Sequence, residues 1–281
     1  MGTEFKKTQL NDLYGLSCIE NFLLYAMKTE GYKYKHLYYE SYLSMCDIIN
    51  EFINNNTKYA SFYKITRLQK IAADNDLIAM EFFNNTDFRN NITKYEYNTV
   101  MVNPEYIKEK YKTELWRDDH YILVAQKDSD NFYYLNDNPR DNGVISYDEL
   151  RRVYSGKMIG FTIKNEIGKE LQNEFLKIFI DSVFRSSFRT EFNYTDLTIV
   201  RDILGILKVL RKRICDYCGM YIPMDFYRDF LLSIDRFYSS IEYMRLRNTI
   251  DFDKINRQFD ELQEKDIELI TVLHEKMRIV K

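Results

Sequence analysis

The chain has 281 residues, of which 45% are hydrophobic and 30% are charged, so it is long enough and apolar enough to bury a core. Three prolines and nine glycines are few for this length, which favours long regular elements, mostly helices, and argues against low-complexity or collagen-like classes. The formal net charge of −3 gives no reason to expect a nucleic-acid partner, and no apolar stretch approaches the roughly 18 residues of a membrane span.

Three helices are expected in the first part of the chain. Apolar residues recur at helical spacing over 18–28, and Ser17 is the natural N-cap, which places Cys18 in the first turn. Residues 37–52 and 64–73 show the same periodicity and are separated by an asparagine-rich turn.

The middle of the chain carries the shorter apolar runs that are typical of strands. A turn at 127–131 joins two of them, so residues 120–126 and 132–137 should pair as an antiparallel hairpin. A long loop is expected at 103–119. The other expected elements are short helices at 88–97 and 146–150 and strands at 77–83, 99–102 and 158–163.

The last part of the chain contains no convincing strand. Helical spacing of apolar residues predicts four helices there, at 169–184, 196–215, 225–247 and 254–278. The sequence therefore predicts an α+β domain over residues 8–165, followed by an α-helical bundle over residues 166–281.

Three side chains could together form a thiol nucleophile and its base. Cys18 lies at a helix start, His120 opens an apolar strand, and Asp137 closes the next strand, with Asn136 as the second choice for the same role. A helix N-terminus favours a thiolate, a His can take the thiol proton, and an Asp or Asn can fix the His tautomer. A lone buried Cys is the common alternative, but the joint placement of the three residues favours the nucleophile.

This order of residues resembles the papain-like cysteine peptidase fold. It is closest to the double-glycine-leader peptidase-like branch and to the acyltransferases of butirosin biosynthesis. The resemblance covers residues 8–165 and implies a Cys18–His120–Asp137 triad without a cofactor. The segments that carry it are Leu16-Ser17-Cys18, Asn98 to Val102, Asp119 to Val124, Tyr133 to Pro139 and Ser146 to Ile163.

The family usually has a Gln shortly before the Cys that helps to bind the oxyanion. The nearby side chains here are Gln9, Asn11 and Asp12, and none is clearly in register, so the backbone N–H of Cys18 is the other expected donor. Residues 166–281 resemble the helical extension of the butirosin-type branch in outline only.

The resemblance implies acyl transfer in antibiotic or other natural-product assembly. An acyl group would arrive as a thioester on the phosphopantetheine arm of a carrier protein, pass to Cys18, and form an amide with a small amine or diamine. The amide-forming enzymes of polythioamide antibiotics are related examples. Because residues 1–7 lack the apolar run of a secretion signal, we expect a cytoplasmic protein, which favours transfer over leader-peptide cleavage.

Two alternatives remain open at the level of the sequence. The same residues could hydrolyse a peptide or a thioester, because both reactions pass through an acylated Cys18. The chain could also be a catalytically degenerate papain-like binding module in which Cys18 is only a core residue.

Two further clusters could be binding features. A basic group on a helix of the second domain could dock an acidic carrier protein, although a solvated helix face is the more common meaning of such a group. Its members are Arg201, Lys208, Arg211, Lys212 and Arg213. Cys215 and Cys218 form half of a zinc motif, but no second pair exists and His274 is isolated, so no metal is expected.

Overall fold

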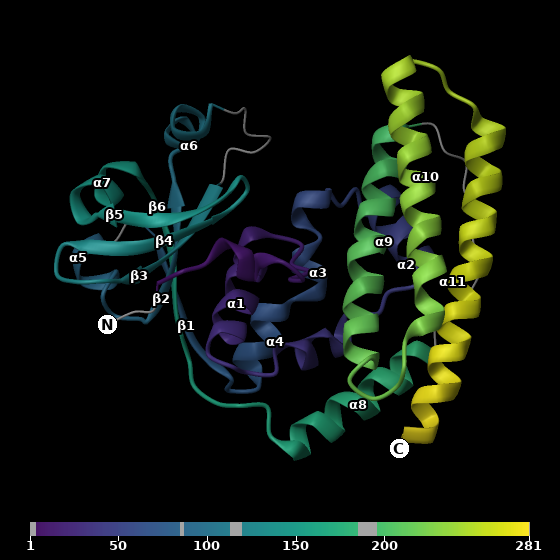
Figure 1. Ribbon diagram of the computed structural model, residues 1–281, viewed down its shortest axis with the longest axis horizontal. Helices are drawn as coiled ribbons and strands as arrows, with labels where there is room; N and C mark the ends of the chain where they lie inside the picture. The colour runs from purple at the N-terminus through teal and green to yellow at the C-terminus, as the bar shows by residue number, and fades with distance from the viewer. Residues whose placement is uncertain (1–3, 85–86, 113–119, 185–195, 281) are drawn as a thin grey trace. The chain divides into compact units, whose positions relative to one another are not determined.

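The computed structural model describes residues 4–84, 87–112, 120–184 and 196–280 (Figure 1). It divides into two compact units, one of residues 1–34 and 67–167 and the other of residues 35–66 and 168–281. The expected division at 165/166 assigned residues 35–66 to the first domain, whereas the structure assigns them to the second. They belong there because Tyr39 stacks on Phe175 with ring centroids 4.0 Å apart, and the carbonyl of Leu43 accepts a hydrogen bond from Arg211.

The first unit is a mixed helix and sheet structure. Its helical elements are η1 (Lys7–Leu10), α1 (Cys18–Thr29), α4 (Leu68–Asp74), α5 (Phe88–Asn91), α6 (Pro104–Tyr111) and α7 (Tyr147–Val153). Its strands are β1 (Ile78–Asn84), β2 (Tyr97–Val102), β3 (His120–Gln126), β4 (Asn131–Asp137), β5 (Arg140–Ser146) and β6 (Tyr154–Ile163). The expectation of an α+β chain is confirmed at this level.

The strands form one antiparallel sheet in the order β1-β6-β2-β3-β4-β5. The predicted hairpin of β3 and β4 is confirmed, with Leu123 opposite Leu135. Because β3 runs antiparallel to both β2 and β4, one end of the sheet carries the start of β3, the end of β2 and the end of β4. We call this end of the sheet the His120 rim.

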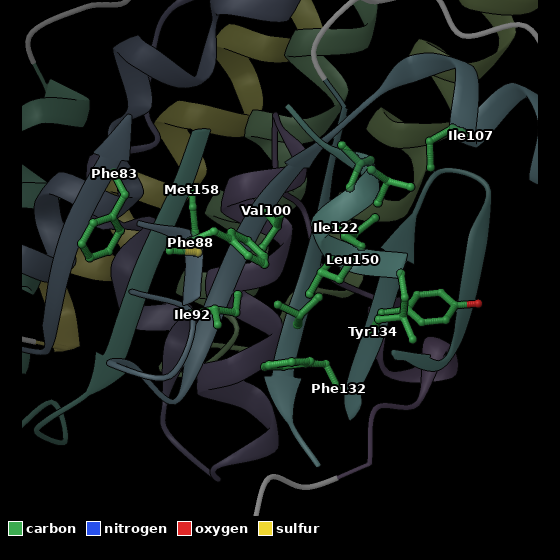
Figure 2. Close-up of a cluster of buried hydrophobic side chains, with 14 residues drawn as sticks. Phe83, Phe88, Ile92, Val100, Ile107, Ile122, Phe132, Tyr134, Leu150 and Met158 are labelled. Atoms are coloured by element: carbon green, nitrogen blue, oxygen red, sulfur yellow. The ribbon is translucent and has the colours of Figure 1, made fainter. Parts of the chain in front are cut away.

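Side-chain alternation divides the sheet into two faces. α1 covers one face, and Tyr97 of β2 donates a hydrogen bond to Glu30 beyond its C-terminal end. The other face carries an apolar core to which α5, α6 and α7 contribute Phe88, Ile107 and Leu150 (Figure 2). Val100, Ile122 and Tyr134 meet these side chains from the strands, and Ile122 and Val124 share this face with His120.

The second unit is entirely helical over its described residues. Its elements are η2 (Tyr34–Glu40, which begins in the first unit), α2 (Met45–Ile53), η3 (Tyr59–Ser61), α3 (Tyr63–Thr66), α8 (Lys169–Phe184), α9 (Leu197–Cys218), η4 (Asp225–Tyr227), α10 (Arg228–Arg247) and α11 (Phe252–Val280). The four long helices, α8 to α11, confirm the predicted helical part of the chain. None of the described helices of the protein has the length and apolar character needed to cross a membrane.

Local chemistry explains where the expected elements were wrong. The predicted helix at 37–52 is interrupted before Ser44, which begins α2 through a capping box with Asp47. The predicted helix at 64–73 breaks at Arg67, which adopts a left-handed conformation at φ 48°. The predicted loop contains α6, whose start is favoured by Asn103 as N-cap and Pro104 in the first turn. Residues 113–119 of that loop lie outside the described chain.

Candidate active site

Cys18 is the first residue of α1 and is partly exposed. The hydroxyl of Ser17 caps the helix by accepting a hydrogen bond of 3.2 Å from the backbone N–H of Glu20. Glu20 is fully buried, and its Oε2 accepts a bond of 2.7 Å from the N–H of Leu16. Both ends of this first turn are therefore fixed, which holds the backbone on each side of Cys18.

Two hydrogen bonds set the direction of α1 over the sheet. Near its start, Asn21 donates from Nδ2 to Oδ2 of Asp137, at the end of β4, over 3.1 Å. At its far end, Glu30 accepts from Tyr97, at the beginning of β2. β2 begins at the end of the sheet opposite the His120 rim, so the C-terminal end of α1 lies there. The start of α1, with Cys18, therefore lies at the His120 rim.

Asn21 connects this helix start to the loop that precedes it. Its Oδ1 accepts a bond of 2.9 Å from the N–H of Gly15, while its Nδ2 bonds to Asp137. A Cβ on Gly15 would lie 2.3 Å from Asn21 Oδ1, so only glycine allows the loop to approach this closely. We call Gly15, Asn21 and Asp137 the clasp, because together they join the loop, α1 and β4.

His120 has an amide partner on the neighbouring strand. Its Nε2 lies 2.7 Å from Oδ1 of Asn136, and the two residues are 8% and 0% exposed. An amide oxygen only accepts, so Nε2 carries the proton in this bond and Nδ1 is left with its lone pair when the ring is neutral. Asn136 Nδ2 is buried without a hydrogen-bond partner in the described part of the chain. The pair thus holds an imidazole in the tautomer of a base.

The expected choice of Asp137 as the partner of His120 is corrected by this geometry. Consecutive residues of a strand face opposite sides, so Asn136 reaches His120 while Asp137 faces α1 and accepts from Asn21. Asn136, the second choice, is the side chain that meets His120. Asp137 is a member of the clasp.

The expected oxyanion side chains lie elsewhere. Gln9 Oε1 accepts a bond of 3.2 Å from Thr29, which ends α1 about 16 Å along the axis from Cys18. Asn11 Oδ1 accepts from Arg140, and its carbonyl accepts from Lys28 in the last turn of α1. Asp12 is exposed. The backbone N–H of Cys18 remains as the candidate donor.

The five members of the basic cluster on α9 differ in their exposure. Arg211 and Arg213 are fully buried, and Arg211 makes a two-pronged bond to Asp266 at 2.6 and 2.7 Å. Arg201 and Lys208 pair with Asp202 and Asp235. Arg211 and Arg213 are therefore not available at the surface, and Arg201 and Lys208 already have partners within the unit.

Both cysteines of α9 are buried. Burial raises the pKa of both Cys215 and Cys218, which makes them poor nucleophiles near neutral pH. Among the described residues there is no group of three His, Cys, Asp or Glu side chains that could hold a metal ion.

Sequence reasoning missed Gly15, Glu20 and Asn21. A signal for Glu20 was present, because Ser17 followed three residues later by Glu is a capping-box pattern. Nothing in the sequence indicated the clasp, which depends on a contact between residues 116 positions apart.

A scan against protein-family models finds no match to the chain, and a search of curated proteins finds none either.

Proposed function

We propose that the chain is a cysteine-dependent acyltransferase of papain-like fold. In this proposal Cys18 is the nucleophile, His120 is the base, and Asn136 orients the imidazole. The observation that carries it is the bond of 2.7 Å between His120 Nε2 and Asn136 Oδ1, at the rim where the clasp fixes the start of α1. The order of the parts, a Cys that begins a helix and then a His and an Asn on successive antiparallel strands, supports the papain-like assignment.

The first half of the reaction acylates Cys18. Its sulfur attacks the carbonyl carbon of a thioester after His120 Nδ1 takes the thiol proton. The bond from that carbon to the donor sulfur breaks, and the departing thiol receives the proton from His120. The backbone N–H of Cys18 would stabilise the oxyanion between these events.

The second half releases the product. An amine attacks the carbonyl of the Cys18 thioester, a C–N bond forms, and the C–S bond to Cys18 breaks. His120 passes the proton of the amine to the sulfur, which restores the thiol. Exchange of one thioester for another is nearly neutral in energy, whereas amide formation is downhill, so transfer requires only that the amine reacts faster than water.

We propose a carrier-protein thioester as donor and a small amine as acceptor, in the assembly of an antibiotic or another natural product. This part rests on the resemblance alone. The phosphopantetheine arm would arrive with the donor, and the chain itself would need no cofactor. Hydrolysis by a peptidase or thioesterase is the competing outcome, with water in place of the amine.

Intact-mass analysis tests the proposal. The full chain is mixed with an acyl thioester of N-acetylcysteamine, with and without a primary amine. We expect one added acyl group, located at Cys18 by peptide mapping, that disappears on addition of the amine as the amide accumulates. The Cys46→Ala variant should acquire the same adduct.

Two results would contradict the proposal. Release of free acid that no amine diverts would make the protein a hydrolase. Failure of Cys18 to acquire any adduct would leave the binding module as the remaining interpretation.

A further inference from the structure

Three tyrosines and the carboxylate of Asp141 surround the ammonium group of Lys110, and the carboxylate of Glu149 also acts on its charge. Lys110 Nζ lies 4.0 Å from the ring centroid of Tyr134, and 5.5 and 5.4 Å from those of Tyr106 and Tyr111. All three distances are within the range of cation–π attraction. We call Tyr106, Tyr111, Tyr134 and Asp141 the tyrosine cluster.

Asp141 is the negative centre of this cluster. Its Oδ2 accepts hydrogen bonds from the hydroxyls of Tyr111 and Tyr134 at 2.7 and 2.6 Å. Burial alone would raise the pKa of Asp141, but these bonds and the nearby Lys110 outweigh it, so the pKa is lowered and the carboxylate stays ionised. The cluster therefore combines a fixed negative charge with the electron-rich faces of aromatic rings.

Lys110 itself is held only loosely by the carboxylate. Its Nζ is 3.9 Å from Asp141 Oδ2, too far for a direct hydrogen bond, and it donates instead to the hydroxyls of Tyr134 at 2.8 Å and Tyr106 at 3.3 Å. The side chains of Lys110 and Asp141 are 29% and 26% exposed, so the cluster opens to solvent. Burial removes part of the hydration of this ammonium and thereby lowers the pKa of Lys110.

The cluster adjoins the candidate active site on the same face of the sheet. Asp141 lies directly opposite Asn136 in the β4–β5 ladder, which places their Cβ atoms about 5 Å apart. Tyr134 is two residues before Asn136 and so points to the same side. Figure 2 shows Tyr134 at the margin of the apolar core, with its hydroxyl directed away from the other labelled side chains. A group bound there would lie beside the partner of His120.

A close backbone approach makes room for the ring of Tyr134. Gly143 is its cross-strand neighbour, and a Cβ on Gly143 would lie 3.0 Å from Tyr134 Cε1. With glycine there, the ring can lie over β5 and direct its hydroxyl to Asp141. The position of this ring, which makes the closest contact with the ammonium, is thus set by the backbone of the sheet.

We propose that the tyrosine cluster binds an alkylammonium group of the substrate and that Lys110 occupies it while the site is empty. The side chain of Lys110 is itself an alkylammonium, so its contacts show what the cluster accepts. The assignment to a substrate rests on the acyl transfer proposed above. The bound group could belong to the acyl donor or to the far end of the amine acceptor, since the amine that reacts must be neutral.

Binding to a protein that cannot turn over tests the site directly. The Cys18→Ala chain is titrated with n-hexylammonium chloride and with 1-hexanol, and the tyrosine ring signals are followed by NMR. We expect the ammonium to bind at least about tenfold more tightly than the alcohol, because desolvated cation–π contacts and Asp141 favour only the cation. Equal affinity for the two probes would overturn the proposal.

Variants identify the residues that bind. Lys110→Gln removes the internal competitor, so hexylammonium should bind at least about fivefold more tightly. Asp141→Asn should weaken its binding about tenfold, and Tyr111→Phe, which keeps the ring, should weaken it less. Glu105→Gln on α6 is the control, since its carboxylate pairs with Lys108, and it should change nothing. An unchanged affinity for hexylammonium in Lys110→Gln would contradict the proposal that Lys110 occupies the empty site.

Turnover then distinguishes the two sources of the ammonium. Rates are compared for donors with and without a terminal ammonium, and for a diamine against a monoamine of the same length. Asp141→Asn should reduce the preference for the cation in only one of these two pairs. If Cys18 acquires no acyl adduct, the proposed acyl transfer is wrong, but the titration with hexylammonium still tests binding at the tyrosine cluster. If the adduct forms and hexylammonium does not bind, only this inference fails.

Discussion

Two helices of the protein begin in nearly the same way, each with a cysteine in its first turn. Ser17 caps α1 before Cys18, and Ser44 caps α2 before Cys46, and each serine accepts a hydrogen bond from the backbone N–H three residues later. Both thiols are partly exposed. The favourable field of a helix N-terminus is therefore common to both.

The surroundings of the two starts differ. The start of α1 is joined by the clasp to the strand whose Asn136 holds His120. Cys46 Sγ instead accepts a weak hydrogen bond of 3.6 Å from Asn50, in the next turn of its own helix. Cys46 is thus an internal control for the effect of a capped helix start. Any greater reactivity of the Cys18 thiol measures the contribution of the residues at the His120 rim.

The largest effect is expected from removal of the thiols themselves. Cys18→Ala should reduce amide formation by at least about 10⁴-fold, because it removes the sulfur that carries the acyl group in the proposed reaction. Cys46→Ala should stay within about twofold of the unmodified protein. Initial rates of thioester consumption in the presence of amine measure both. Similar losses of amide formation in the two variants would show that Cys18 has no special role in the reaction compared with Cys46.

A second change acts on the start of α2 alone. Asp266→Ala would leave the buried guanidinium of Arg211 without its carboxylate, at a cost of about 3–5 kcal/mol in the free energy of unfolding. Arg211 also bonds to the carbonyl of Leu43 beside Ser44, so alkylation of Cys46 should become faster. Urea denaturation and peptide mapping after iodoacetamide measure the two effects.

Asp202→Ala is the matched control for this change. Asp202 lies on the same helix as Arg211 and pairs with Arg201 nearer the surface, so its loss should cost less than about 1 kcal/mol. Faster alkylation of Cys18 in Asp266→Ala would show that the two helix starts do not respond independently.

Removal of His120 should make the alkylation rates of the two thiols similar. In the unmodified protein, iodoacetamide at neutral pH should alkylate Cys18 about 10²-fold faster than Cys46 if His120 acts as the proposed base and stabilises the thiolate. His120→Ala should bring this ratio close to one. Quantitative peptide mapping of a time course gives both rates in one sample. A ratio that survives the substitution would assign the reactivity to the helix start alone.

Local patterning predicted the elements of the site better than its contacts. Alternation and turn residues were sufficient for the β3–β4 hairpin and for His120 at the beginning of a strand. β5 was missed because Arg140–Ser146 contains Asp, Asn and Gly, which have low strand propensity, and it forms through its pairing with β4.

The choice between Asn136 and Asp137 could not be made from the sequence. Neighbouring residues on a strand face opposite sides, so a register known only to within one residue leaves both possible. Chemistry favoured the carboxylate, whereas the pairing of the sheet decides which side chain meets His120.

The smallest expected effect separates Asn136 from Asp137. Asn136→Ala removes the partner of His120 Nε2, so kcat should fall about tenfold and the alkylation ratio of Cys18 to Cys46 should fall with it. Asp137→Ala loosens the clasp but leaves the imidazole bonded, so kcat should fall only about threefold. Asn136→Asp can still accept from Nε2 and should recover most of the loss, whereas Asn136→Leu keeps the bulk but cannot accept and should not; a mere packing role predicts that both variants rescue. The opposite ranking, with Asp137→Ala the more damaging, would show that the clasp at the start of α1 matters more to the reaction than the bond from His120 to Asn136.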